Sequence, residues 1–177
     1  MGLIESLLIG VVSGVVASVT YAILMKFMRP KIKIVDVAIH NVEKNLFIIK
    51  VINRTKSRIT DVSCYLQYYS HMSNGFRSIE VKPYISIPPT IEKYIDDRDS
   101  IDAPSMYAVQ YGFVVPEEVN FSDEDMLVFS IKAVHPVSGT SSYDIMEYEF
   151  GKSGKVRKNV AFDAGDNMGV HAIDAYN

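Results

Sequence analysis

The sequence predicts a mainly β protein in which one membrane-spanning helix at the N-terminus precedes an antiparallel β-sandwich. Three observations support this fold class. Residues 6–25 form an apolar run without a charged side chain. From residue 31 onward, apolar and polar residues alternate in short runs, which is the pattern of half-buried strands. Turn residues separate these runs at intervals of roughly 8–12 residues, as in antiparallel sandwiches.

The apolar run is long enough to cross a bilayer as a helix. Twenty residues that each rise about 1.5 Å cover the roughly 30 Å hydrocarbon core. The run is too long for the core of a cleaved signal peptide, and neither Lys nor Arg precedes it, so we expect an anchor. Pro30 should end the helix, because proline cannot donate to the helical hydrogen-bond ladder. Residues 1–30 are therefore assigned to the anchor helix.

Basic residues follow the apolar run, whereas the α-amino group and Glu5 nearly cancel before it. The following cluster consists of Lys26, Arg29, Lys31 and Lys33. Because basic flanks stay on the cytoplasmic side, we expect a single-pass cell-membrane protein, most simply of the bacterial inner membrane. Its N-terminus would lie outside and its C-terminal domain in the cytoplasm. The net charge of -3 and the scattered basic residues disfavour a nucleic-acid partner.

Seven segments after the anchor carry a strand pattern. They are residues 31–40, 45–53, 59–69, 76–87, 106–115, 126–134 and 143–150. The second is almost entirely apolar and rich in β-branched residues, which fits a central strand. Asn74-Gly75 supplies a tight turn between two of them. We expect residues 31–150 to form the β-sandwich, and residues 151–177 to form a tail that adds an edge strand or stays flexible.

In strand number, length and rhythm, residues 31–150 resemble an immunoglobulin-like sandwich. The chain has no Trp and a single Cys, so it lacks the Trp and the disulfide of antibody domains. The resemblance is therefore to the broad architecture, and a C2-type sandwich or a jelly roll fits the same pattern. Fold alone does not imply function.

Every fourth residue of the apolar run is small, which places a row of small side chains along one side of the helix. The row consists of Ser6, Gly10, Gly14, Ser18 and Ala22. Helix backbones approach closely across such rows, so we expect a helix–helix interface and a homo-oligomer within membrane lipid. With Val after each Gly, residues 10–18 resemble the glycophorin dimer motif, which implies self-association through the helix.

A partner surface is predicted on the strand at residues 59–69. Tyr65, Gln67 and Tyr69 lie on the face opposite to the apolar residues of this strand. Tyrosine is frequent at interfaces because it combines a large rigid ring with a polar hydroxyl. We therefore expect this face of the sandwich to bind a protein or ligand whose identity the sequence does not specify.

No catalytic or metal-ligating pattern is found in the sequence. The four His residues are far apart and lack ligand spacing. Cys64 falls on the apolar face of its strand, where a buried, unreactive thiol is expected. Two acidic clusters, at residues 96–102 and 117–125, are expected to be solvated loop acids and not a calcium site. The sequence thus predicts a protein that is not an enzyme and that uses neither a cofactor nor a metal.

Three functions fit these features. The favoured one is an oligomerising anchor that presents the sandwich as a binding or sensing module. The first alternative is a membrane-perturbing or pore-forming effector, although a helix that is apolar on all sides lines an aqueous pore poorly. The second is a filament or shell subunit, because residues 1–5 and the apolar run resemble the N-terminus of type IV pilins.

Overall fold

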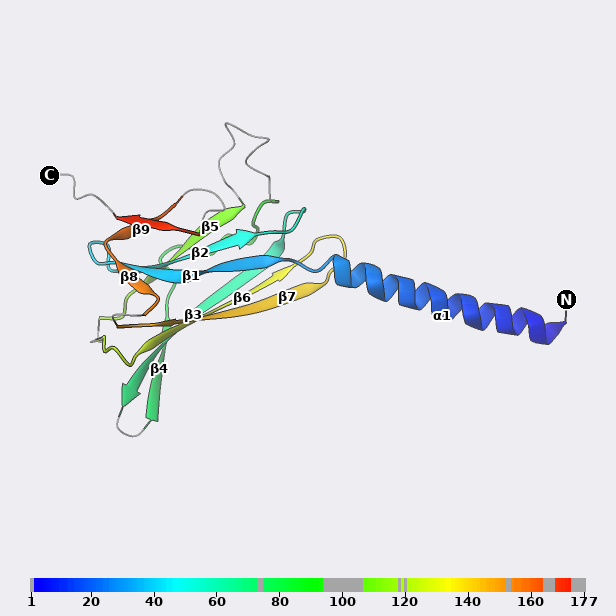
Figure 1. Ribbon diagram of the computed structural model, residues 1–177, viewed down its shortest axis with the longest axis horizontal. Helices are drawn as coiled ribbons and strands as arrows, with labels where there is room; N and C mark the ends of the chain where they lie inside the picture. Colours follow the sequence, from blue (N-terminus) through cyan, green and yellow to red (C-terminus); the bar gives the residue numbers. More distant parts are fainter. Residues whose placement is uncertain are drawn as a thin grey trace, which may run out of the picture.

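The computed structural model describes residues 2–72, 75–93, 107–117, 119, 121–151, 154–163 and 168–172 (Figure 1). In chain order the elements are α1 (Leu3–Phe27), β1 (Ile32–Asn41), β2 (Leu46–Asn53), β3 (Thr60–Met72), β4 (Gly75–Val81), β5 (Ala108–Val114), β6 (Met126–Val134), β7 (Ser141–Glu149), β8 (Val156–Lys158), β9 (Val160–Phe162) and β10 (Val170–Ala172). The expected class, mainly β with one N-terminal apolar helix followed by antiparallel sheets, is confirmed.

Two four-stranded sheets enclose the core. Sheet A has the order β5-β2-β1-β8, and sheet B has the order β4-β3-β6-β7. The strand pairs described within both sheets are antiparallel, except that β8 runs parallel to β1. The hydroxyl of Tyr148 in β7 donates to the carbonyl of Val35 in β1 at 2.7 Å, so a buried hydrogen bond joins the two sheets.

The core lies between the inner faces of the sheets. From β3, Cys64, Leu66 and Tyr68 point inward, and the residues between them are partly or fully exposed. The inward residues of β2, among them Phe47 and Ile49, meet them from sheet A. This alternation in β3 is the pattern that the sequence predicts for a half-buried strand.

Sheet A is also covered on its outer face. In β1 the register shifts between Ile34 and Ala38, and these two residues join the main core. Val35 and Ile39 instead pack on the outer side with Phe162 of the C-terminal segment. The apolar character of β1 and β2 therefore has two causes, the core on one face and the C-terminal segment on the other.

The C-terminal segment contributes three short strands. One of them, β8, lies at the edge of sheet A, which agrees with the first of the two alternatives expected for residues 151–177. The strands β9 and β10 form a separate hairpin beside sheet A (Figure 1). Lys50 of β2 is 2% exposed beneath this segment, and its Nζ donates to the carbonyl of Asp163 at 2.6 Å.

The segment expected as one strand at residues 76–87 belongs to both sheets. β4 pairs with β3 in sheet B as far as Val81. The chain then crosses to sheet A, where Tyr84 N donates to Gly112 O at 2.8 Å and Val114 N donates to Lys82 O at 2.9 Å. The expected single strand is therefore wrong in its second half. Asn74 of the expected turn lies outside the described residues.

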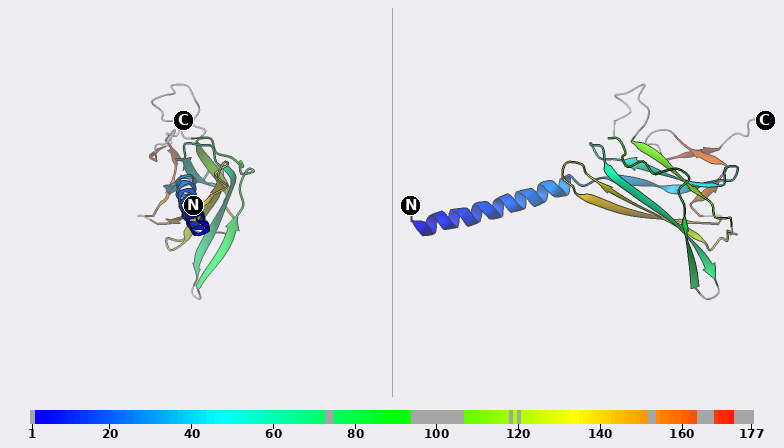
Figure 2. Two further views of the ribbon diagram at one scale, coloured as in Figure 1. Left: turned by 90° about the vertical axis from the view of Figure 1, so that its right-hand side faces the viewer. Right: turned by 180° about the vertical axis from the view of Figure 1, so that it is seen from behind.

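Helix α1 extends away from the sheets along the long axis of the molecule (Figure 2). It ends at Phe27, before Pro30, as expected. Its apolar stretch, Ile4–Phe27, is long and apolar enough to cross a membrane, and its most apolar window has no side chains buried against the rest of the chain. Thr140, in the loop between β6 and β7, donates its hydroxyl to Met28 O at 3.1 Å, which ties the end of the helix to sheet B.

Candidate interaction surfaces

The row of small residues on α1 is open along its length. A Cβ atom added to Gly10 or Gly14 would meet nothing within 4 Å, apart from the helix's own nearby backbone. The hydroxyl of Ser18 donates to Gly14 O at 2.8 Å, so this polar group is satisfied within the helix. The row therefore offers a smooth surface to a second helix, and its members have no packing role inside this chain.

The outer face of sheet B brings together Tyr65, Gln67 and Tyr69, which the sequence predicts as a partner surface. Tyr69 donates its hydroxyl to Gln67 Oε1 at 2.8 Å. The register across β3, β6 and β7 places Tyr65 in line with Ile145, with Ser130 between them. Tyr65 and Ile145 are 57% and 53% exposed.

Tyr143, on the same face of β7, is 61% exposed and extends this surface. Tyr143 and Ile145 are not predicted from the sequence, although the alternation in residues 143–150 contains the signal. Alternate residues of this strand are large on both faces, and only the register identifies the outer face. Tyr65, Tyr143 and Ile145 form an exposed apolar group, which we call the outer patch of sheet B.

A groove of about 610 Å³ lies where the chain crosses from sheet B to sheet A. Ile79, Pro83 and Val114 contribute apolar surface, and charges of both signs, including Arg77 and Glu117, lie among the other lining residues. The mixed charge gives this groove no preference for ligands of one sign.

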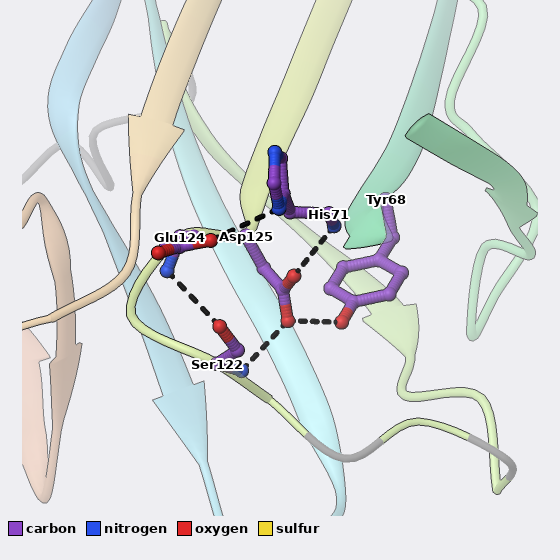
Figure 3. Close-up of polar contacts among 5 residues, drawn as sticks. All are labelled: Tyr68, His71, Ser122, Glu124 and Asp125. Atoms are coloured by element: carbon purple, nitrogen blue, oxygen red, sulfur yellow. Dashed lines mark hydrogen bonds and ion pairs between the residues drawn. The ribbon is translucent and has the colours of Figure 1, made fainter. Parts of the chain in front are cut away.

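Asp125 is the centre of a buried hydrogen-bond network, shown in Figure 3. It is 1% exposed. Its carboxylate accepts from the Tyr68 hydroxyl at 2.5 Å, from Ser122 N at 2.7 Å and from His71 N at 3.0 Å. The expectation that the acids at residues 117–125 are all solvated is therefore wrong for Asp125, because β3 and the loop before β6 enclose it.

The same network sets the ionisation of its two central groups. Burial alone would raise the pKa of Asp125, but its hydrogen-bond donors outweigh burial and lower the pKa. Burial and the hydrogen bond to Asp125 raise the pKa of Tyr68 to about 12. At neutral pH the carboxylate is charged and the phenol neutral, so neither group exchanges a proton. The network joins the end of β3 to the loop before β6, which is a structural role.

The possible metal ligands among the described residues are dispersed. In this part of the chain, no group of three or more His, Cys, Asp or Glu side chains could hold a metal ion. His40 packs against Phe47 and Phe121, at ring distances of 5.1 and 5.2 Å. Burial, followed by the charge of Lys158, lowers its pKa. The acidic cluster at residues 96–102 lies outside the described residues.

Cys64 should resist thiol reagents in the folded protein. It is 4% exposed, and burial raises its pKa to about 12, so almost no thiolate forms at neutral pH. We expect a maleimide to label Cys64 only when the domain unfolds, with labelling that follows the urea transition measured by circular dichroism. Rapid labelling in native buffer would contradict this. A Lys132→Cys variant provides an exposed control thiol.

Comparisons with known proteins show no family for this chain. No family model matches it, and no curated protein sequence matches it. Among solved structures, the crystal structure of the E. coli chaperone DraB is similar, with a TM-score of 0.40 and 12% sequence identity, over 78% of this chain and 67% of that chain. What the protein does must therefore be inferred from its own surfaces.

Proposed function

We propose that this protein is a single-pass membrane protein that self-associates through α1 and presents its β-sandwich as a binding or sensing module. One observation carries the proposal. The apolar stretch Ile4–Phe27 is long enough to cross a bilayer, and its most apolar window has no side chain buried against the rest of the chain. An apolar surface of this size needs lipid or other helices to cover it.

The flanking charges support a cytoplasmic position for the sandwich. The uncharged run at residues 6–25 is followed by four basic residues, Lys26, Arg29, Lys31 and Lys33, and is preceded by the acidic Glu5. Glu5 accepts from Gly2 N at 2.9 Å at the start of the helix. Lys and Arg near the end of a membrane helix favour the cytoplasmic side.

The outer patch of sheet B supports the binding half of the proposal. Its three large side chains come from two strands and are each more than half exposed. Exposed aromatic and aliphatic side chains that form a group are typical of protein interfaces. With Gln67 and Tyr69 beside them, they combine apolar area with hydrogen-bonding groups. A protein partner is the occupant that fits such a mixed surface.

Replacing Gly14 with isoleucine should lower the size of the assembly in detergent. A Cβ atom at this position meets nothing within 4 Å apart from the helix's own nearby backbone, so the effect should fall on contacts between helices. Loss of close backbone packing should reduce self-association by about 1–2 kcal/mol per contact, by analogy with interhelical contact energies. Light scattering coupled to size-exclusion chromatography of the extracted protein measures this.

Val16→Ile is the matched control, because it adds bulk to another side of the same helix. The control should keep the wild-type size. An unchanged size in Gly14→Ile would contradict self-association through the row.

In the same experiment, Tyr65→Ser with Ile145→Ser should leave the size unchanged, because we assign the outer patch of sheet B to a different protein. A smaller assembly in that variant would instead make the patch a self-association surface.

A further inference from the structure

A cavity of about 310 Å³ lies at the junction between the end of α1 and the sandwich. Its volume falls at the lower end of the range for small-ligand pockets, roughly 300–1,000 Å³. The lining residues come from the helix end, from the loop after β2 and from the loop after β6. They are Phe27, Met28, Arg29, Lys31, Arg54, Thr55, Lys56, Ser57 and His135.

The loop after β2, residues 54–57, is held in place by buried hydrogen bonds. Asn53 is fully buried, and its side-chain amide donates to Ser57 O at 3.0 Å and to Glu92 O at 2.8 Å. Its Oδ1 accepts from Thr55 N at 2.8 Å. The Thr55 hydroxyl in turn accepts from Lys31 N at 2.8 Å. The loop and the chain that leaves the helix therefore form one fixed wall of the cavity.

The cavity is basic. Four of its lining residues are Lys or Arg, and none is Asp or Glu. Glu92, whose carbonyl accepts from Asn53, is an acid that lies close to this loop. Its carboxylate lies 3.7 Å from the guanidinium of Arg58 and forms an ion pair with it. Ser57 lines the cavity, and its hydroxyl is buried without a hydrogen-bond partner among the described residues. Basic side chains with an unused hydroxyl favour an oxyanion such as a phosphodiester.

From this geometry we infer that the cavity binds the phosphate-bearing headgroup of an anionic phospholipid. The inference rests on the proposed function, in which α1 crosses the membrane. Phe27, the last helical residue, is 75% exposed and lines the cavity, so the cavity opens at the level where the apolar stretch meets the headgroups. Basic pockets at this level are suited to anionic headgroups, because the negative surface potential adds to each contact.

A second basic group provides a contrast. Lys155, Arg157 and Lys158 are exposed around β8, which lies at the end of the sandwich remote from α1 (Figure 1). The basic cavity and the basic residues around β8 are both positively charged, but they differ in their position relative to α1. Only the junction cavity can meet headgroups of the bilayer that α1 crosses.

The test is a titration of the full chain in detergent with short-chain phosphatidylglycerol, short-chain phosphatidylcholine and inorganic phosphate, followed by microscale thermophoresis. The pocket variant is Lys31→Gln with Lys56→Gln, and the matched control is Arg157→Gln with Lys158→Gln. All four side chains are exposed, so both variants should fold, which circular dichroism checks. Wild type and control should bind phosphatidylglycerol more tightly than phosphatidylcholine. The pocket variant should weaken phosphatidylglycerol binding by roughly 10- to 30-fold.

Three results would overturn the inference. They are equal affinity for the two lipids, equal loss in both variants, and inorganic phosphate bound as tightly as phosphatidylglycerol, which would indicate a free-anion site. The size of the assembly, measured on the same samples, reports on the proposed function separately. An assembly of the expected size without lipid preference would refute only headgroup binding in the cavity. A lipid preference without an assembly would refute only self-association.

Discussion

Replacing Gly154 with alanine is expected to lower the free energy of unfolding by about 3 kcal/mol or more. A Cβ atom at this position would lie closer to the Glu149 carbonyl oxygen than van der Waals radii allow, and 2.6 Å from the Phe150 carbonyl oxygen. Both are backbone atoms, so no side-chain rotation can relieve the clash. The backbone around the turn must move instead.

That turn connects β7 to the C-terminal segment. Gly154 N donates to Gly151 O at 3.1 Å, and Lys155 N donates to Glu149 O at 2.9 Å. The carbonyl of Lys155 then accepts from Ala38 N of β1 at 3.0 Å, which starts the parallel pairing of β8. A shift of the turn therefore weakens the end of β7 and the pairing of β8 together.

Gly112→Ala is the matched control for this prediction. A Cβ atom there would meet Tyr84 Cβ at 3.7 Å and Leu46 Cδ1 at 3.8 Å, which are ordinary contacts. We expect its free energy of unfolding to change by less than about 1 kcal/mol, since the smaller entropy of the unfolded chain favours alanine. Urea unfolding of the detergent-solubilised protein, followed by circular dichroism, compares both variants. Equal stability of the two would contradict the steric argument.

The sequence predicts the strands well where one periodicity covers the whole element. Residues 126–134 alternate cleanly between one apolar face and one mixed face, and β6 has these bounds. The prediction fails at residues 76–87, because Pro83 lies where the chain changes sheets and the pairing partner changes with it. Strands of three residues, such as β8, are too short to carry a periodicity, so the tail could not be assigned.

The candidate surfaces also differ in how far the sequence predicts them. Local alternation is sufficient to place Tyr65, Gln67 and Tyr69 together on one face of β3. The outer patch of sheet B and the basic cavity depend on which segments meet in space, and local alternation contains no such information. Asp125 shows this most clearly, since it lies in an acidic loop and has the composition of a solvated residue. Only the position of Tyr68 and the end of β3 makes it a buried acceptor.

Replacing Asp125 with alanine should destabilise the protein by about 3 kcal/mol. The change removes the acceptor of the Tyr68 hydroxyl, of the backbone N–H groups of Ser122 and His71, and of the Ser70 side chain. A buried donor without an acceptor loses its hydrogen bond to water and gains none in return. Tyr68→Phe removes one donor and leaves the carboxylate with its other donors, so its effect should be smaller.

Glu124→Ala is the control for Asp125→Ala, because it removes the neighbouring carboxylate of the same loop. Glu124 is largely exposed, and its Oε2 pairs with His71 Nδ1 at 2.9 Å on the surface. Surface ion pairs contribute little, so the change should stay within about 1 kcal/mol. Urea unfolding at neutral pH measures all three variants. A loss in Glu124→Ala as large as that in Asp125→Ala would refute the buried network as the source of stability.

The pH dependence of this contribution has a defined sign. The pKa of Asp125 is lower in the folded protein than the ordinary value, which applies to the unfolded chain. The stability that its charge provides is therefore fully present above the unfolded pKa and is lost as the pH falls through the folded pKa.

Asp125→Asn keeps an acceptor oxygen but no charge. The stability difference between wild type and Asp125→Asn should stay constant from pH 7 to about 5 and shrink below about pH 4. Because the other acids titrate in both proteins, a difference that stays constant down to about pH 2.5 would show that the charge of Asp125 does not stabilise the fold.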